Sequence, residues 1–265
     1  MGEQRRVPLG VDVTQMSHAR AYDYVLGGKD NYAVDRDGAE QVMALAPDLP
    51  VVAMAQRRFL IRVTEMCARL GIDQFLDIGT GIPTSPNVHE AARAIIPDAR
   101  VVYIDNDPIV LLHNNALLAG DDGVVSIQAD VRDPDEIFKH PSVRRHIDFE
   151  KPMLLLFVGL FHLVDDEDDP PALVARFRDR LAPGSHVMIS QFCTDGSDPA
   201  AKAKIEEISE HSTASMNFRT RAEIEQMFDG FEILEPGVVD VQEWWPDEKA
   251  PPTALKVAAG VGRLN

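Results

Sequence analysis

The sequence is poor in cysteine and has no long apolar run. Its two cysteines, Cys67 and Cys193, form no C-x-x-C pair and lie near no histidine cluster, which argues against a disulfide framework or a structural zinc site. The longest apolar run, residues 153–164, falls far short of the roughly 20 residues that span a bilayer. Arg5 and Arg6 precede no apolar signal segment. We therefore expect a cytoplasmic protein without a membrane partner.

Basic residues are also scarce. The 26 lysines and arginines stand against 43 acidic residues, which gives a formal net charge of -17. Such a charge repels a phosphate backbone, so we expect no nucleic-acid partner, whereas a neutral or cationic small molecule meets no such barrier. The acidic run at 165–169 lacks other ligand types and indicates a solvated helix entry, so we expect no metal. The oligomeric state remains open.

The length and the hydrophobic pattern favour one α/β core with an accessory segment. The chain has 265 residues, of which 45% are hydrophobic, enough for one core but not for two large domains. Residues 1–74 are mostly helical in pattern, and we expect them to form an N-terminal helical cap with a lid loop. From residue 75 onward, strands and helices alternate, which predicts parallel βαβ units over residues 75–265.

Local patterns give three further expectations. Ser17 and Ser85 are placed to cap helices. Residues 231–234 and 255–261 are expected to pair as a terminal hairpin. Residues 243–246, which include the two tryptophans, are expected to form a wet loop between them.

A glycine turn follows the first predicted strand. Leu76 and Ile78 alternate as in a buried parallel strand, and Gly79 and Gly81 allow a close approach of the backbone to a ligand. This pattern predicts a nucleotide-cofactor site. The third glycine of G-x-G-x-x-G is missing, because Thr84 occupies its position, and this argues against a dinucleotide.

Acidic residues end the first three predicted strands. Asp105 ends the second strand, where a carboxylate accepts hydrogen bonds from a ribose diol. Asp130 ends the third strand on the same rim and is placed to accept from an exocyclic amine such as that of adenine. Asp77, with the carbonyl of Gly79, supplies acceptors for an amino-acid ammonium. This combination favours S-adenosyl-L-methionine as the cofactor.

At these residues the chain resembles the class I S-adenosylmethionine-dependent methyltransferases. More narrowly, it resembles an actinobacterial S-adenosyl methyltransferase family once known only as a domain of unknown function. The resemblance rests on motifs spread over nearly the whole chain: 19–24, 26–32, 76–84, 87–90, 102–108, 128–130, 235–237 and 245–246. It implies a Rossmann-like, seven-stranded, mostly parallel sheet with an antiparallel C-terminal hairpin.

The resemblance also implies how the cofactor is held. Gly79 and Gly81 would lie at its amino-acid end, Asp105 on the ribose, and Asp130 with Val131 near the adenine. The predicted cofactor-binding set is Tyr22, Gly28, Lys29, Asn31, Asp77, Gly79, Thr80, Gly81, Asp105, Asn106, Asp130, Val131 and Gly159.

Residues 27–32 permit two interpretations. They form either a lid over the cofactor or an ordinary helix stop followed by a solvated turn. Arg57 and Arg58 suit a solvated helix face, although one of them would also supply a cation for the cofactor carboxylate. A sulfonium further suits an aromatic-lined cleft, for which the candidates are Tyr22, Tyr24, Tyr32 and Phe157.

The prediction for function is transfer of a methyl group to an oxygen or nitrogen of a small-molecule acceptor. The N-terminal helices and residues 216–245 are expected to form the acceptor pocket. His162, just past the fourth strand, is the candidate general base, with a packed structural histidine as the alternative. Two other functions remain open: a non-catalytic module that binds the cofactor or its product, and a nicotinamide oxidoreductase.

Overall fold

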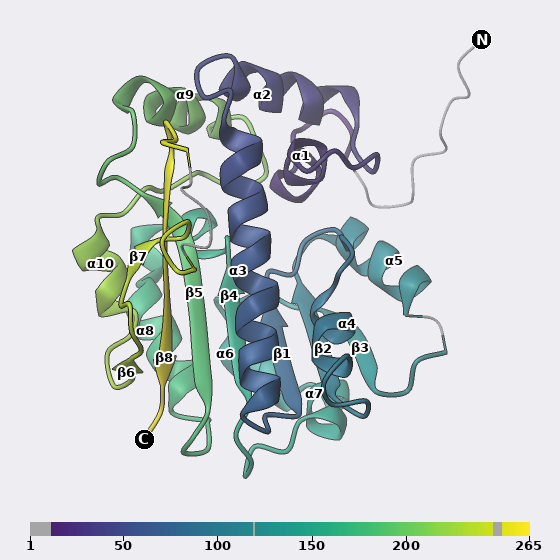
Figure 1. The fold of residues 1–265 in the computed structure, drawn as a ribbon. Helices are drawn as coiled ribbons and strands as arrows, with labels where there is room; N and C mark the ends of the chain where they lie inside the picture. The colour runs from purple at the N-terminus through teal and green to yellow at the C-terminus, as the bar shows by residue number, and fades with distance from the viewer. Residues whose placement is uncertain (1–11, 119, 246–250) are drawn as a thin grey trace.

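The computed structural model describes residues 12–118, 120–245 and 251–265, and at its centre is one twisted sheet (Figure 1). The strand order is β3-β2-β1-β4-β5-β8-β6, and β7 also pairs with β8. Strands β1 to β5 are parallel, whereas β8 is antiparallel to its neighbours. The predicted Rossmann-like sheet with an antiparallel C-terminal pair is thus confirmed. The strands are β1 Gln74–Ile78, β2 Arg100–Asp105, β3 Val124–Gln128, β4 Leu154–Val158, β5 His186–Cys193, β6 Glu232–Ile233, β7 Val239–Asp240 and β8 Lys256–Arg263.

Helices cover both faces of the sheet and the carboxyl ends of its parallel strands. The α-helices are α1 His18–Val25, α2 Ala33–Met43, α3 Leu49–Arg69, α4 Val88–Arg93, α5 Pro108–Leu117, α6 Pro134–Lys139, α7 Pro141–His146, α8 Pro170–Arg178, α9 Pro199–Ser209 and α10 Arg221–Gln226. Two 3-10 turns, η1 Phe161–Leu163 and η2 Asp166–Asp168, follow β4.

Two apolar clusters sandwich the sheet, one on each face. Phe75 packs on the side of α3 with Phe59, whereas the next residue, Leu76, packs on the side of α8 with Phe177. This alternation follows from the two-residue period of a strand whose two faces are both buried. Helix α3 runs along the sheet (Figure 1), so the last of the predicted N-terminal helices covers a sheet face.

The edge strand beyond β8 is broken. Residues 231–234 pair with the last strand as predicted, but the partners of β6 are Gly262 and Arg263, just beyond the predicted range 255–261. Within that range, the N–H of Leu234 donates to the Val261 carbonyl. Further along the same strand, β7 pairs at Ala258 and Ala259. The residues between β6 and β7 leave the ladder. The edge therefore consists of two short segments, of which β6 was predicted and β7 was not.

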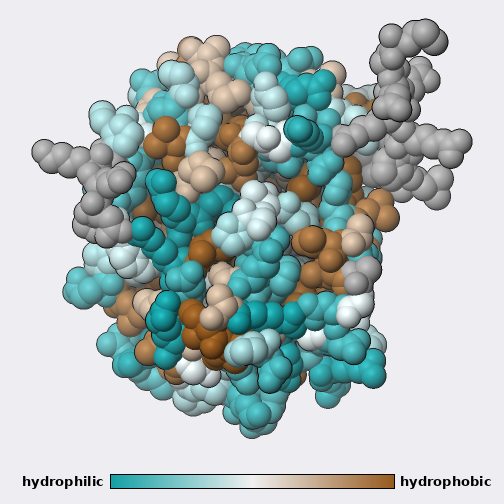
Figure 2. Space-filling view, turned by 45° about the vertical axis from the view of Figure 1, so that its right-hand side comes forward, coloured by the Kyte–Doolittle hydropathy of each residue, from teal (hydrophilic) through white to brown (hydrophobic). Residues whose placement is uncertain are grey.

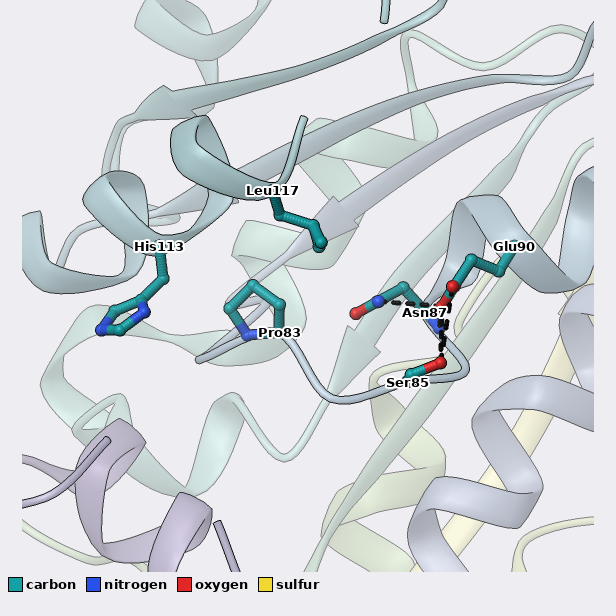
Figure 3. A pocket seen from close by; sticks show the side chains of 6 residues that line it. All are labelled: Pro83, Ser85, Asn87, Glu90, His113 and Leu117. Carbon is teal, nitrogen blue, oxygen red and sulfur yellow. Dashed lines mark hydrogen bonds between the residues drawn. The ribbon is translucent and has the colours of Figure 1, made fainter. Parts of the chain in front are cut away.

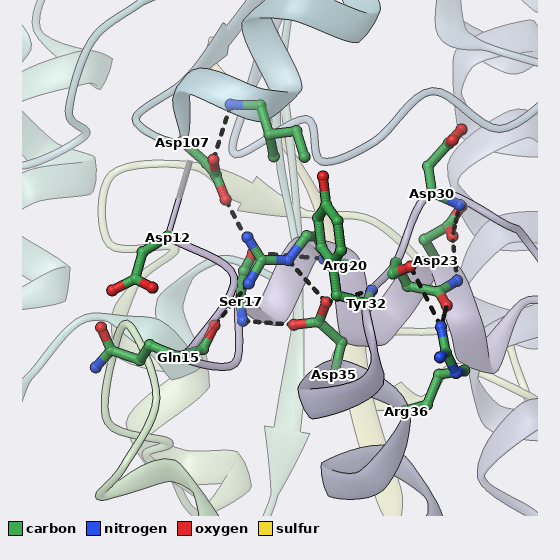
Figure 4. Close-up of polar contacts among 12 residues, drawn as sticks. Asp12, Gln15, Ser17, Arg20, Asp23, Asp30, Tyr32, Asp35, Arg36 and Asp107 are labelled. Carbon is green, nitrogen blue, oxygen red and sulfur yellow. Dashed lines mark hydrogen bonds and ion pairs between the residues drawn. The ribbon is translucent and has the colours of Figure 1, made fainter. Parts of the chain in front are cut away.

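The first two helices lie over the end of the sheet and are held by a buried ion pair (Figure 4). Arg20 Nε of α1 lies 2.8 Å from Asp35 Oδ2 of α2, and these side chains are 3% and 0% exposed. Asp35 also accepts from the backbone N–H groups of Ser17 and Tyr32. The Ser17 hydroxyl donates to Asp107 Oδ2 at 2.8 Å. Asp107 follows β2, so these contacts connect α1, α2 and the rim of the sheet.

The structure corrects one predicted helix start. Ser17 caps α1 as expected, but Ser85 does not cap the helix after the glycine turn. That helix begins at Val88, and Asn87 and Glu90 form its capping box. An Asn-x-x-Glu pattern satisfies two backbone donors at once, and this reciprocal cap sets the start of the helix after Pro86.

The two tryptophans were expected in a wet loop, and that expectation is wrong. Trp244 is 6% exposed, and its Nε1 donates to the carbonyl of Ala259 at 2.8 Å. Its ring lies 5.3 Å from that of Phe59 on α3, and Trp245 packs beside it. Residues 246–250 lie outside the described residues. Burial of Trp244 and partial burial of Trp245 against α3 outweigh the polar character of their neighbours in sequence.

Hydrophobic side chains on the face drawn in Figure 2 form several separate groups among hydrophilic ones. In the part of the chain that the structure describes, no helix is both long and apolar enough to cross a bilayer.

The buried ion pair between α1 and α2 gives a stability prediction. Asp35→Ala leaves Arg20 charged and unpaired inside the protein, so we expect it to lower the free energy of unfolding by about 3–5 kcal/mol. Urea unfolding followed by circular dichroism measures this change. Asp37→Ala, an exposed acid on the same helix, is the matched control and is expected to change stability by about 0.5 kcal/mol or less. Equal effects of the two substitutions would contradict the assignment.

Candidate functional site

A large cavity opens where the parallel strands end. Its volume is about 790 Å³, which lies within the range of small-molecule sites. The loops after β1 to β4 form one side, and α1, α2, the start of α3 and α9 with the segment after it form the other. This is the position at which open parallel sheets bind ligands.

The glycine turn after β1 lies in the wall of this cavity. Gly79 has a φ of 74° and Gly81 a φ of 66°. Residues other than glycine rarely adopt this region of backbone conformation. A Cβ on Gly79 would also come within 2.7 Å of the Leu160 side chain. The backbone N–H groups of Gly79 and Thr80 both donate to the carbonyl of Ile104. The turn is therefore fixed against the end of β2.

Asp105 links the turn after β1 to the turn after β2. Its Oδ2 accepts from the Gly81 N–H and its Oδ1 from the Asp107 N–H, each at 2.9 Å. Burial raises the pKa of Asp105 to about 6. Because each carboxylate oxygen accepts more than one hydrogen bond, Asp105 still has acceptor capacity toward the cavity that it lines.

Asp77 is a buried carboxyl in the cavity wall. It is 5% exposed, and its Oδ2 accepts from the Thr80 hydroxyl at 3.1 Å. Burial raises its pKa to about 7, although the Thr80 hydrogen bond and the charge of Arg57 oppose this shift. No salt bridge to Asp77 occurs within the described residues. A buried carboxylate of this kind suits a cationic ligand group.

Asp130 lies on the predicted rim but is already ion-paired. Arg132 Nε donates to its Oδ1 at 2.9 Å, and Asn106 Nδ2 donates to its Oδ2 at 3.3 Å. Burial opposes ionisation of Asp130, yet the hydrogen bonds from Arg132 lower its pKa. Val131 beside it lines the cavity. A ligand amine at Asp130 would therefore share the carboxylate with Arg132.

The loop at residues 27–32 is organised by Asp23 of α1. Asp23 Oδ2 accepts from Asp30 N at 2.8 Å and from Asn31 Nδ2 at 2.9 Å, and a Cβ on Gly28 would collide with the same carboxylate. Lys29 is exposed.

The predicted cofactor contacts of this loop find no support in the geometry. Gly28, Lys29 and Asn31 are absent from the described cavity wall, whereas Tyr22 of α1 belongs to it. The Tyr22 hydroxyl donates to the carbonyl of Ala53. Of the other predicted aromatic residues, Phe157 is fully buried in the core, and Tyr24 and Tyr32 lie outside the wall.

His162 lies in the cavity wall, on the 3-10 turn after β4. Its ring centroid is 5.1 Å from that of Phe192. Burial lowers its pKa to about 3, so the imidazole is neutral at physiological pH and a weak proton acceptor. Gly159, just before this turn, has a φ of 68° and also lines the cavity.

Arg219 holds the segment that carries His162, a role that no pattern in the sequence indicates. Its guanidinium donates to the carbonyls of Phe161 at 2.6 Å and Val164 at 2.8 Å. The backbone N–H of Asn217 donates to the His162 carbonyl at 2.7 Å. These contacts join segments that are more than 50 residues apart in the sequence. Local sequence patterns do not indicate contacts over such a separation.

Two neighbouring residues of α3 enter the site. Gln56 is buried, and its Nε2 donates to the Ser190 hydroxyl at 2.8 Å. Arg57 donates to the carbonyls of Thr84 and Pro86, which connects α3 to the segment after the glycine turn. Both residues line the cavity. Arg57, one of two arginines considered as a cation for a ligand carboxylate, is therefore suitably placed.

Of the two parts of the expected acceptor region, the N-terminal helices line the cavity, whereas residues 216–245 largely do not. From residues 216–245, only the first residue, Met216, is among the lining residues. Trp244 packs instead in the core. The opposite wall comes from α9 through Ile205 and Ile208 and from the segment that leads to Met216.

A second, smaller cavity of about 280 Å³ lies beside α4 and α5 (Figure 3). Glu90 accepts hydrogen bonds there from the Ser85 hydroxyl and from the side chain of Asn87. These contacts hold Glu90 in the capping box of α4, so the polar groups of Ser85, Asn87 and Glu90 are already hydrogen-bonded within the protein. Within the described residues, no group of three or more histidine, cysteine or acidic side chains is arranged to hold a metal.

Comparisons with known proteins agree with this geometry. The family model described as S-adenosyl methyltransferase matches residues 4–265. No curated protein gives a significant match. A crystal structure of a candidate methyltransferase from Thermobifida fusca YX is 41% identical, with a TM-score of 0.90, and the match covers 97% of this chain and 98% of that one.

A second solved structure is similarly close. A DUF574 family protein from Streptomyces avermitilis MA-4680 is 37% identical, with a TM-score of 0.91, over 96% of this chain and 99% of that one. Human N-acetylserotonin methyltransferase, crystallised with S-adenosylmethionine, shares the fold at 13% identity with a TM-score of 0.50, over 94% of this chain and 64% of that one. The chain therefore belongs to the S-adenosyl methyltransferase family and is an S-adenosylmethionine-dependent methyltransferase.

Proposed function

We propose that the protein transfers the methyl group of S-adenosylmethionine to an oxygen or nitrogen of a small molecule held in the same cavity. The observation that carries this proposal is the continuity of the cavity. One space of about 790 Å³ runs from the strand-end acids to an apolar wall under α2 and α9. A donor and an acceptor can therefore lie in contact inside it.

The residues at the strand ends fit the cofactor. Asp77 offers a buried carboxylate for the ammonium, and Arg57 offers a cation for the carboxylate. Asp105 faces the position of the ribose, and Val131 with Ala129 offers an apolar surface for the adenine. Thr80 and Asn106 belong to the same wall. Thr80 donates to Asp77 and Asn106 donates to Asp130.

When bound there, the cofactor would supply a methyl group carried by a sulfonium, and the remainder of the cofactor would be released as a neutral thioether. Because the donor is already activated, the protein's main task is to orient the acceptor and exclude water. The cap of α1 and α2, fastened to Asp107 through Ser17, provides the covering. The walls of the cavity orient the acceptor.

Transfer to a small molecule predicts where a labelled methyl group goes. With tritiated cofactor and a cell extract, we expect label to appear in the fraction of low molecular mass. Label confined to precipitated protein or nucleic acid would contradict a small-molecule acceptor. Tight cofactor binding with no transfer in any fraction would favour a non-catalytic binding module.

The ribose assignment predicts a loss of affinity. Asp105→Asn and Asp105→Ala are expected to weaken binding of S-adenosylhomocysteine by about 1.5 kcal/mol or more, since they remove hydrogen bonds to a charged acceptor. Isothermal titration calorimetry measures this as a loss of about tenfold. Asp122→Ala, an exposed acid beyond α5, serves as the control. Unchanged affinity in folded Asp105 variants would remove the assignment.

The raised pKa of Asp77 predicts pH-dependent binding. An ammonium is attracted only by the ionised carboxyl, so affinity for S-adenosylmethionine is expected to fall as the pH drops from about 8 through 7, where Asp77 becomes protonated. Protonation of Asp105 near pH 6 extends the loss. Asp77→Asn is expected to bind more weakly and to lose the upper part of this dependence. Calorimetry showing constant affinity between pH 6 and 8 would contradict the role of Asp77.

A further inference from the structure

The end of the cavity away from the strand-end acids is an apolar surface, which we call the acceptor wall. Its members come from α2, α3, β5, α9 and the segment after α9, and all of them both line the cavity and pack in one cluster: Val42, Leu49, Phe192, Ile205, Ile208 and Met216. Side chains so far apart in sequence converge here on one space. Such a surface suits the apolar part of a ligand.

One polar side chain beside the acceptor wall lacks a partner. His162 is 8% exposed and packs on Phe192, and its Nδ1 is buried without a hydrogen bond in the described structure. The other histidine here is satisfied, since His18 Nε2 is bonded to the Ala214 carbonyl at 2.7 Å and to the Ser212 hydroxyl at 2.8 Å. Because His162 lines the cavity and a buried polar group without a partner destabilises the protein, a hydrogen bond from a bound molecule to this ring would be favourable.

The charges around the cavity disfavour an anion. Of the arginines among the described lining residues, Arg20 is paired with Asp35 and Arg132 with Asp130. Arg57, which donates to two carbonyls, keeps its charge and is the cation assigned to the carboxylate of the cofactor, so it is not left for the acceptor. Burial lowers the pKa of both His18 and His162, so neither adds positive charge at neutral pH. The acids of the wall outnumber these arginines and are Asp12, Asp77, Asp105, Asp107, Asp130, Asp165 and Glu210. The resulting field repels anionic ligands.

We propose that the acceptor is a neutral, largely apolar molecule whose hydroxyl or N–H group hydrogen-bonds to the His162 ring, and that anionic acceptors are rejected. This inference rests on the proposed function, because it takes the acceptor wall as the place of the methyl acceptor. His162 acts as a positioning residue, and the acceptor wall holds the apolar remainder of the molecule. Arg219 and Asn217 keep the His162 segment in place.

Three small fluorinated probes test this assignment on the full chain. Protein saturated with S-adenosylhomocysteine is titrated with 4-fluorophenol, fluorobenzene and 4-fluorobenzoate, and binding is followed by fluorine NMR. We expect 4-fluorophenol to bind about threefold to tenfold more tightly than fluorobenzene, the range of one net hydrogen bond. The carboxylate is expected to bind most weakly.

His162→Phe separates a hydrogen bond from a packing role. This variant keeps an aromatic ring beside Phe192, so fluorobenzene should bind as before while the preference for the phenol disappears. His113→Phe, on α5 beside the smaller cavity, is the matched control and should keep the preference. If His162→Phe does not fold, His162→Gln, which retains hydrogen-bonding atoms, is expected to keep a preference for the phenol.

The outcomes distinguish this inference from the proposed function. Failure of S-adenosylhomocysteine to bind the wild-type protein would overturn the proposed function itself. If that ligand binds, three results overturn the inference alone: 4-fluorobenzoate binding as tightly as the phenol, no binding of 4-fluorophenol, or an unchanged preference in His162→Phe.

Discussion

The site depends on the parallel pairing of β1 with β2. Ile78 lies opposite Ile104 in that ladder, so the turn after β1 begins where β2 ends. The Ile104 carbonyl accepts from Gly79 and Thr80, and the Asp105 side chain accepts from Gly81. A shift of one residue in this register would turn every side chain of the strand to the opposite face. The glycine turn, Asp77 and Asp105 would then no longer face one cavity.

The cap is connected to the same rim by charged and polar contacts. Ser17 reaches Asp107, whose backbone N–H in turn donates to Asp105. The carboxyl expected to hold the ribose is thus two hydrogen bonds away from the first cap helix. Asp35 holds Ser17 and Arg20 from the second helix. Covering the cavity and shaping the cofactor site are therefore parts of one network. Figure 4 shows the part of it that runs from Arg20 and Asp35 through Ser17 to Asp107.

The fold and the cofactor side of the site could be predicted because their signals are local. A strand, a glycine turn and an acid at the next strand's end occur within short stretches, and the topology of parallel βαβ units brings those ends together. The lid contacts of Gly28, Lys29 and Asn31 remain a prediction without geometric support, because Asp23 holds that loop outside the cavity wall. Trp244 was misjudged because its polar neighbours in sequence do not reveal the apolar face of α3 against which it packs.

By itself, the sequence determined the Rossmann-like sheet, the positions of Asp77, Asp105 and Asp130 on its rim, and the class of cofactor. The tertiary structure alone decided the acceptor side. It placed α9 opposite α2, set His162 against Phe192, and brought Arg219 to a segment 55 residues away. The reason is physical: periodicity and capping act between neighbours in the chain, whereas the shape and charge of a cavity arise from the packing of segments that the chain brings together only when it folds.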